Sequence, residues 1–216
     1  MEDRIPVVYF TGLYDFIDRY YGTNMITLTV RKGLDGMGVI SSTPEGSLLA
    51  SRAQGRPTFT AFSGDLRRVQ SLHKIASGLN LVMSGFWQYT NEPLYSAEEF
   101  GVGGRIYGRG YDLGEILGDR GGAITTEIQY DNTLFKKKLS YQLYSFFDMG
   151  KVWNIDTANR KTSNEEPSLE SAGVGTRLKW NNYLALNAEI AKPLRRFPAT
   201  QYNRDPRYFL GVEFTF

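Results

Sequence analysis

The sequence predicts an all-β chain whose antiparallel strands form part of a transmembrane β-barrel. Aromatic residues make up 14% of the 216 residues, and 23 glycines stand against 8 prolines, a composition typical of pleated strands and tight turns. Apolar and polar residues alternate with a period of two in several runs, and short and long connections alternate strictly between these runs. A barrel is favoured over a soluble sandwich because a barrel gathers its short turns at one end and its long loops at the other.

About nine strands are expected, each of roughly ten residues, which is the length that a tilted strand needs to cross a bilayer. The first three show the weaker alternation and lie near 5–17, 23–33 and 57–69. In the fourth, at 79–89, Leu79, Leu81 and Met83 form the apolar series. The other five are expected at 124–131, 139–150, 171–180, 183–190 and 207–216.

The connections between these strands fall into two classes. Four are short, at 18–22, 70–76, 132–137 and 181–182, and four are long and rich in Gly, Pro, Ser and Asn, at 34–56, 91–120, 150–168 and 193–206. Bacterial single-chain barrels have an even number of strands, so nine strands that begin almost directly after Met1 indicate a partial barrel. We therefore expect residues 1–216 to be the C-terminal part of a longer barrel, with its N-terminal strands absent.

Composition excludes several classes of site. His73 is the only histidine and there is no cysteine, which excludes a His/Cys zinc site. Ser71 and His73 bear only a thin resemblance to a hydrolytic site, so no enzyme is expected. The 25 Lys and Arg nearly balance the 23 Asp and Glu without a basic block, so no nucleic-acid partner is expected. The glycine-rich GGRIYGRG lacks the Lys-Ser/Thr ending of a phosphate loop, and neither a metal nor a cofactor is expected.

Two motifs connect the chain with a known family. The long central loop contains GGRIYGRGYDLGEILGDRGG at 103–122, the next strand supplies Glu127, and the strand after it ends in FFDMG at 146–150. In this order and spacing they resemble the transporters of two-partner secretion, the haemolysin activation/secretion type within the POTRA-linked barrel superfamily. The resemblance spans essentially the whole chain. It implies a barrel of about sixteen strands, a loop at 91–120 folded into its lumen, and POTRA domains that are absent from residues 1–216.

The same residues suggest how that loop is held. Arg109 lies between Gly108 and Gly110, which let the backbone bend and approach the barrel wall. Asp148 lies on the polar parity of its strand, and a guanidinium and a carboxylate can pair bidentately in a partly dehydrated lumen. The resemblance implies this Arg109–Asp148 pairing, flanked by Tyr111, Phe146 and Gly150. Three further charged residues fall on inward parities and are expected to line the lumen: Glu127, Arg177 and Glu213.

The last strand ends on an aromatic residue. Its apolar series consists of Tyr208, Leu210, Val212, Phe214 and Phe216. Outer-membrane proteins typically end in such a strand, so this series is expected to face lipid and to serve as a signal to the barrel-assembly machinery.

The sequence therefore predicts a protein in the outer membrane of a Gram-negative bacterium, in contact with outer-membrane lipid. The resemblance implies that it translocates an unfolded exoprotein partner, such as a haemolysin, adhesin or contact-dependent toxin, without nucleotide hydrolysis. Two alternatives remain open. One is a barrel-assembly insertase of the same superfamily, and the other is a passive porin-like channel, which the loop motif disfavours.

Overall fold

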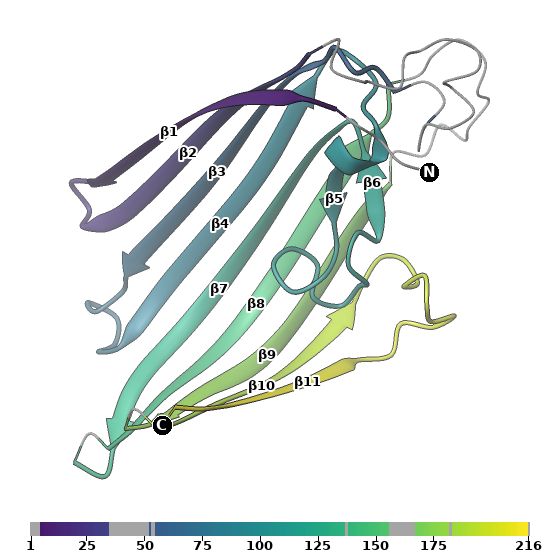
Figure 1. Ribbon diagram of the computed structural model, residues 1–216. Helices are drawn as coiled ribbons and strands as arrows, with labels where there is room; N and C mark the ends of the chain where they lie inside the picture. Colours follow the sequence, from purple (N-terminus) through teal and green to yellow (C-terminus); the bar gives the residue numbers. More distant parts are fainter. Residues whose placement is uncertain are drawn as a thin grey trace.

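The computed structural model describes residues 5–34, 52, 55–136, 138–155, 167–181 and 183–215. Nine strands form one curved antiparallel sheet in which each strand pairs with its neighbours along the chain (Figure 1). They are β1 (Val7–Ile17), β2 (Gly22–Gly33), β3 (Thr60–Ser71), β4 (Leu79–Thr90), β7 (Arg120–Leu134), β8 (Leu139–Trp153), β9 (Ser168–Trp180), β10 (Leu184–Pro193) and β11 (Arg207–Phe214). The predicted all-β class and the nine antiparallel strands are confirmed. Over the described residues the sheet is open, with β1 and β11 as its two edges.

Short turns and long loops lie at opposite ends of the sheet, as the sequence predicts. The strands β1–β2, β3–β4, β7–β8 and β9–β10 are joined by turns at 18–21, 72–78, 135–138 and 181–183. The strand ends that the long connections 34–59, 91–119, 154–167 and 194–206 join lie at the other end. Of the first and third of these connections, the structure describes only residues 34, 52, 55–59, 154–155 and 167. We call these the turn end and the loop end.

Alternation along each strand gives the sheet two distinct faces. The inner face carries Asp148, Glu127 and the residues of the same parity on the neighbouring strands, and the long loop 91–119 packs on it. The outer face exposes large apolar side chains on each of the nine strands of this sheet. Examples are Phe10, Leu28, Leu66, Ile128, Leu143, Val174, Ile190 and Tyr208. Such a face is suited to lipid because burial in an apolar medium removes it from water.

Loop 91–119 has secondary structure that the sequence analysis did not predict. It contains a short 3-10 helix, η1 (Ser96–Glu98), and a two-stranded hairpin of β5 (Phe100–Val102) and β6 (Ile116–Gly118) (Figure 1). Strands of three residues are too short for an alternation signal to emerge. Hairpin and wall share one apolar cluster, in which Phe100, Val102, Tyr111 and Ile116 meet Ala123, Val152 and Leu169.

The same packing explains why β7 begins four residues earlier than predicted. A Cβ atom at Gly121 would lie 2.0 Å from the ring of Phe100, so only glycine leaves room for that ring. The glycine pair at 121–122 therefore continues the strand beneath the loop and does not end it.

Candidate functional site

Arg109 lies at the tip of a tight turn that descends onto the inner face. Gly108 has a φ of +95°, a conformation that side chains rarely allow, and the amide of Tyr111 donates to the carbonyl of Gly108 at 2.9 Å. The turn buries Arg109 to 4% exposure, although arginine side chains are mostly exposed in proteins. The sequence thus forms a turn that delivers one guanidinium to the wall.

Asp148 receives that guanidinium on β8. Nε of Arg109 donates to Oδ2 of Asp148 at 3.1 Å and Nη2 donates to Oδ1 at 2.8 Å, which is a bidentate pair. The same carboxylate accepts the backbone amides of Gly108 and Arg109 at 3.2 and 2.9 Å. The hydroxyls of Thr125 and Ser171 also donate to it, at 2.6 and 3.1 Å. Asp148 is fully buried, and its oxygens satisfy both the side chain and the backbone of the turn.

Two further carboxylates complete the environment of Arg109. Nη1 lies 2.5 Å from Oε1 of Glu127 on β7 and 3.5 Å from Oε2 of Glu189 on β10. The guanidinium carbon also lies 3.4 Å from the centre of the Phe146 ring, a cation–π contact. Burial alone would lower the pKa of Arg109, but its bonds with Asp148 and Glu127 outweigh burial and raise that pKa. The guanidinium therefore stays charged.

Glu189 is the member of this site that the sequence analysis did not single out. It is 4% exposed, it accepts the hydroxyl of Tyr144 at 2.8 Å, and Nη1 of Arg105 lies 3.1 Å from its Oε1. Its inward parity on β10 was visible in the sequence. What the sequence could not show is that β10 brings it beside Arg109, because β10 is separated from the loop by some 80 residues.

Two predicted residues without charge, one on the loop and one on the wall, hold the loop in place. The hydroxyl of Tyr111 donates to the carbonyl of Glu170 at 2.9 Å and accepts the amides of Arg195 and Arg196 at 3.3 Å. A Cβ atom at Gly150 would lie 2.5 Å from Cγ1 of Val102, so this glycine makes room for β5. Tyr111 thus joins the loop to β9 and to residues 195–196, and Gly150 leaves space for the loop in the wall.

The three predicted lining residues have different positions. Glu127 pairs with Arg109. Nη1 of Arg177 lies 3.4 Å from Oε2 of Glu127, so Arg177 is at the margin of the same network. Glu213 lies on the inner face of β11 but is exposed. The residue of β11 that pairs with Glu189 is Phe209, and Glu213 lies four residues further along the strand. The structure thus brings the first two together and leaves Glu213 outside the network.

The predicted C-terminal series lies on the outer face. Tyr208, Leu210, Val212 and Phe214 are between 50% and 74% exposed. Phe216 lies outside the described residues. The exposure of these side chains fits contact with lipid, and their role as an assembly signal stays a prediction.

Another fully buried carboxylate, Asp119, connects residues from three long loops at the loop end of the sheet. Its Oδ1 accepts a hydrogen bond from Nη1 of Arg52 at 2.5 Å, and its Oδ2 accepts one from Nη2 at 3.1 Å. It also accepts the backbone amides of Leu94 and Ile155, both at 2.7 Å. Sequence analysis missed this residue, because Asp119 carries no periodic signal and its partners come from three separate connections.

Gly110 is expected to be essential for docking of the loop. A Cβ atom there would lie 2.7 Å from the backbone nitrogen of Pro193 and 3.0 Å from Cβ of Ser171, so Gly110→Val should push the turn off the wall. We expect faster proteolysis of loop 91–119 by about tenfold, since overpacking costs on the order of 1–3 kcal/mol. Gly12→Val is the matched control, because nothing lies within 4 Å of a Cβ there. Equal proteolysis of the two variants would contradict the close approach.

A curved sheet with an apolar outer face, a charged inner face and a loop anchored on that inner face defines a segment of an outer-membrane-type β-barrel with an internal loop. The model of the haemolysin secretion/activation protein family ShlB/FhaC/HecB matches residues 18–178. The chain belongs to this family, and the predicted resemblance to two-partner-secretion transporters is confirmed.

Relatives and solved structures agree with this assignment. The heme/hemopexin transporter protein HuxB of Haemophilus influenzae is 28% identical over 142 residues, which are 65% of this chain and 25% of HuxB. CdiB from Escherichia coli matches 97% of the chain with a TM-score of 0.77 at 14% identity, and CdiB from Acinetobacter baumannii matches 94% with a TM-score of 0.68 at 18% identity. These two similarities show the fold. The chain spans about a quarter of HuxB and about a third of each CdiB chain.

Proposed function

We propose that this chain forms the C-terminal part of an outer-membrane conduit of a Gram-negative bacterium, through which an unfolded exoprotein is secreted by two-partner secretion. The exoprotein would be a haemolysin, an adhesin or a contact-dependent toxin. The protein would make and break no covalent bond, and it would hydrolyse no nucleotide.

The anchored turn at Arg109 carries this proposal. A passive pore needs a polar wall, but it has no need for a loop in which the single side chain of Arg109 engages Asp148, Glu127 and Glu189 together. Removing such an ion cluster from water costs free energy. Buried ionic groups can nevertheless select one specific conformation of the chain. We infer that the anchor keeps loop 91–119 in a defined position inside the conduit, where the loop can restrict the passage or guide the exoprotein.

The inner face suits an extended polypeptide. Away from the anchor it carries both signs of charge, with Asp65, Arg67, Asp131, Lys179 and Glu213 on inward positions. A wall of mixed charge offers hydrogen bonds to a passing backbone without holding one sign of side chain tightly.

Reconstitution tests the proposal. The full-length transporter that contains this segment would be inserted into liposomes, and its unfolded exoprotein would be added without nucleotide. We expect the exoprotein to become protease-protected inside the liposomes, and liposomes with an unrelated porin serve as the control. Solute flux without protected exoprotein would instead identify a porin-like channel. Faster folding of other barrels without protected exoprotein would identify an insertase, and either result contradicts the proposal.

A further inference from the structure

The outer face concentrates positive charge at the loop end. Four basic side chains lie on outward positions within three residues of that end of their strands: Lys32, Arg120, Lys151 and Lys192. Among the described strand residues of this face, the one carboxylate is Glu170. Toward the turn end, Arg68 is paired with Asp18. The inner face, by contrast, carries both signs of charge along its length.

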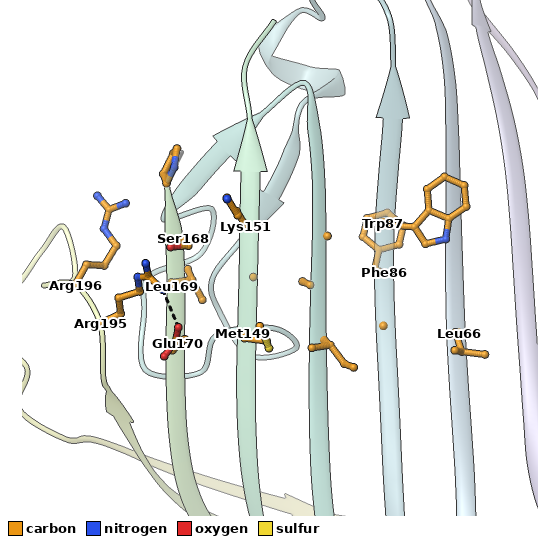
Figure 2. Close-up of a pocket in the computed structure, with 16 residues that line it drawn as sticks. Leu66, Phe86, Trp87, Met149, Lys151, Ser168, Leu169, Glu170, Arg195 and Arg196 are labelled. Carbon is orange, nitrogen blue, oxygen red and sulfur yellow. Dashed lines mark hydrogen bonds and ion pairs between the residues drawn. The ribbon is translucent and has the colours of Figure 1, made fainter. Parts of the chain in front are cut away.

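An apolar groove opens toward this basic rim. It has a volume of about 1200 Å³, and its floor includes Gly85 and Gly122. A Cβ atom at Gly122 would meet no atom within 4 Å, and one at Gly85 would meet only a carbonyl oxygen at 3.6 Å, so the floor is open. Trp87 and Leu66 stand at one side, and Met149 lies toward the other (Figure 2).

The sheet register places groove and charge side by side. Gly122 pairs with Trp87 on β4 and with Lys151 on β8, so an aromatic wall, an open floor and a cation follow one another across three strands. Arg195 and Arg196 line the same groove beyond β9 (Figure 2). Arg195 is paired with Glu170 at 2.9 Å, and the exposed Arg196 adds a further positive charge. Among the described residues that line this groove, three cations and one carboxylate thus lie at the rim.

These two features select one kind of ligand. The apolar floor and walls fit an acyl chain, and guanidinium and ammonium groups at its mouth fit a phosphate at the head of that chain. The loop end of an outer-membrane barrel faces the outside, where the lipid leaflet consists of phosphorylated, multiply acylated glycolipid. A phospholipid of the inner leaflet would instead place its headgroup at the turn end.

We propose that the groove between Trp87 and Arg196 is a binding site for lipid A, with an acyl chain over Gly85 and Gly122 and a phosphate beside Lys151 and Arg196. This inference rests on the outer-membrane placement proposed above, but not on secretion. It assigns the basic rim a specific lipid and explains why the cations gather on one end of one face.

Binding of purified lipid A to the full-length protein in detergent tests this site by native mass spectrometry. A basic side chain beside an anionic lipid contributes on the order of fivefold in affinity, so Lys151→Gln with Arg196→Gln should weaken binding about 25-fold. Gly122→Leu should weaken binding as well, because its side chain would occupy the floor while the cations remain. Lipid A without its phosphates should bind the unaltered protein as weakly as intact lipid A binds the double variant.

The matched control is Lys74→Gln with Lys138→Gln, which removes the same charge from turns at the opposite end of the sheet. Its affinity for lipid A should equal that of the unaltered protein. The site is refuted if this control weakens binding as much as the rim variant, since net charge alone would then explain the effect. Equal binding of lipid A with and without phosphates also overturns it. Because secretion is not measured, failure of the transport proposal and failure of this site are distinguishable.

Discussion

Replacing Asp148 with alanine is expected to abolish most secretion by the full-length transporter while leaving insertion of the barrel intact. The change would leave Arg109 and the amides of Gly108 and Arg109 without their main acceptor in a buried place. Breaking one partner of a buried pair costs about 3 kcal/mol or more, which lowers the docked population of the turn by on the order of 100-fold. Secreted exoprotein and heat-modifiable barrel in the membrane fraction measure the two effects separately.

Arg109→Ala should impair secretion at least as strongly, because it leaves three neighbouring carboxylates without their shared cation. The double variant should be little worse than Arg109→Ala, since the interaction is already lost. Arg109→Lys is the informative control, because lysine keeps the charge but cannot form the bidentate pair. Defects that multiply in the double variant would show that the two residues act separately. Normal secretion by both single variants would rule out the anchored turn.

Asp119→Ala is expected to loosen the loop end of the sheet more than any other single change in the loops. It would remove the acceptor of the amides of Leu94 and Ile155 at a position with no exposed surface. It would also remove one acceptor of Arg52, which would keep Glu99 and the carbonyl of Leu94 nearby. Each buried donor left without an acceptor costs about 1–3 kcal/mol, so a total of about 4 kcal/mol is expected. Limited proteolysis of folded protein should show cleavage of loop 91–119 accelerated by more than about 100-fold.

Asp112→Ala provides the control in the same loop. Asp112 pairs with Arg207 at 2.8 Å and accepts the hydroxyl of Thr200 at 2.7 Å, but it is partly exposed. The hydrogen bond from Thr200 and the pair with Arg207 lower the pKa of Asp112, so any stabilisation that it provides is lost as the pH falls through that lowered pKa. A partly exposed pair contributes about 1 kcal/mol or less, so its loss should accelerate cleavage only about fivefold. Similar cleavage of both variants would contradict the special role of Asp119.

The sequence alone determined the strands, the two faces and the order of short and long connections. These features depend on the alternation of apolar and polar residues with a period of two. That alternation is a local property of runs such as Leu139 to Met149. Arg109, Asp148 and the aromatic C-terminal series could be singled out in the same way, because glycines mark the turn and parity marks the face. The loop hairpin β5–β6 could not, since its strands are shorter than one full alternation.

Only the tertiary structure decided which charges meet. Glu189 shares its inward parity with Glu213, yet one lies beside Arg109 and the other is exposed, because register and the depth of the turn place β10 and not the end of β11 there. Asp119 has no strand pattern at all and acquires its role from three loops that converge on it. The position of a residue in the alternation tells which face of the sheet its side chain occupies. Which side chains meet on that face depends on how deep the loop lies over the sheet, and that depth is decided only in the folded structure.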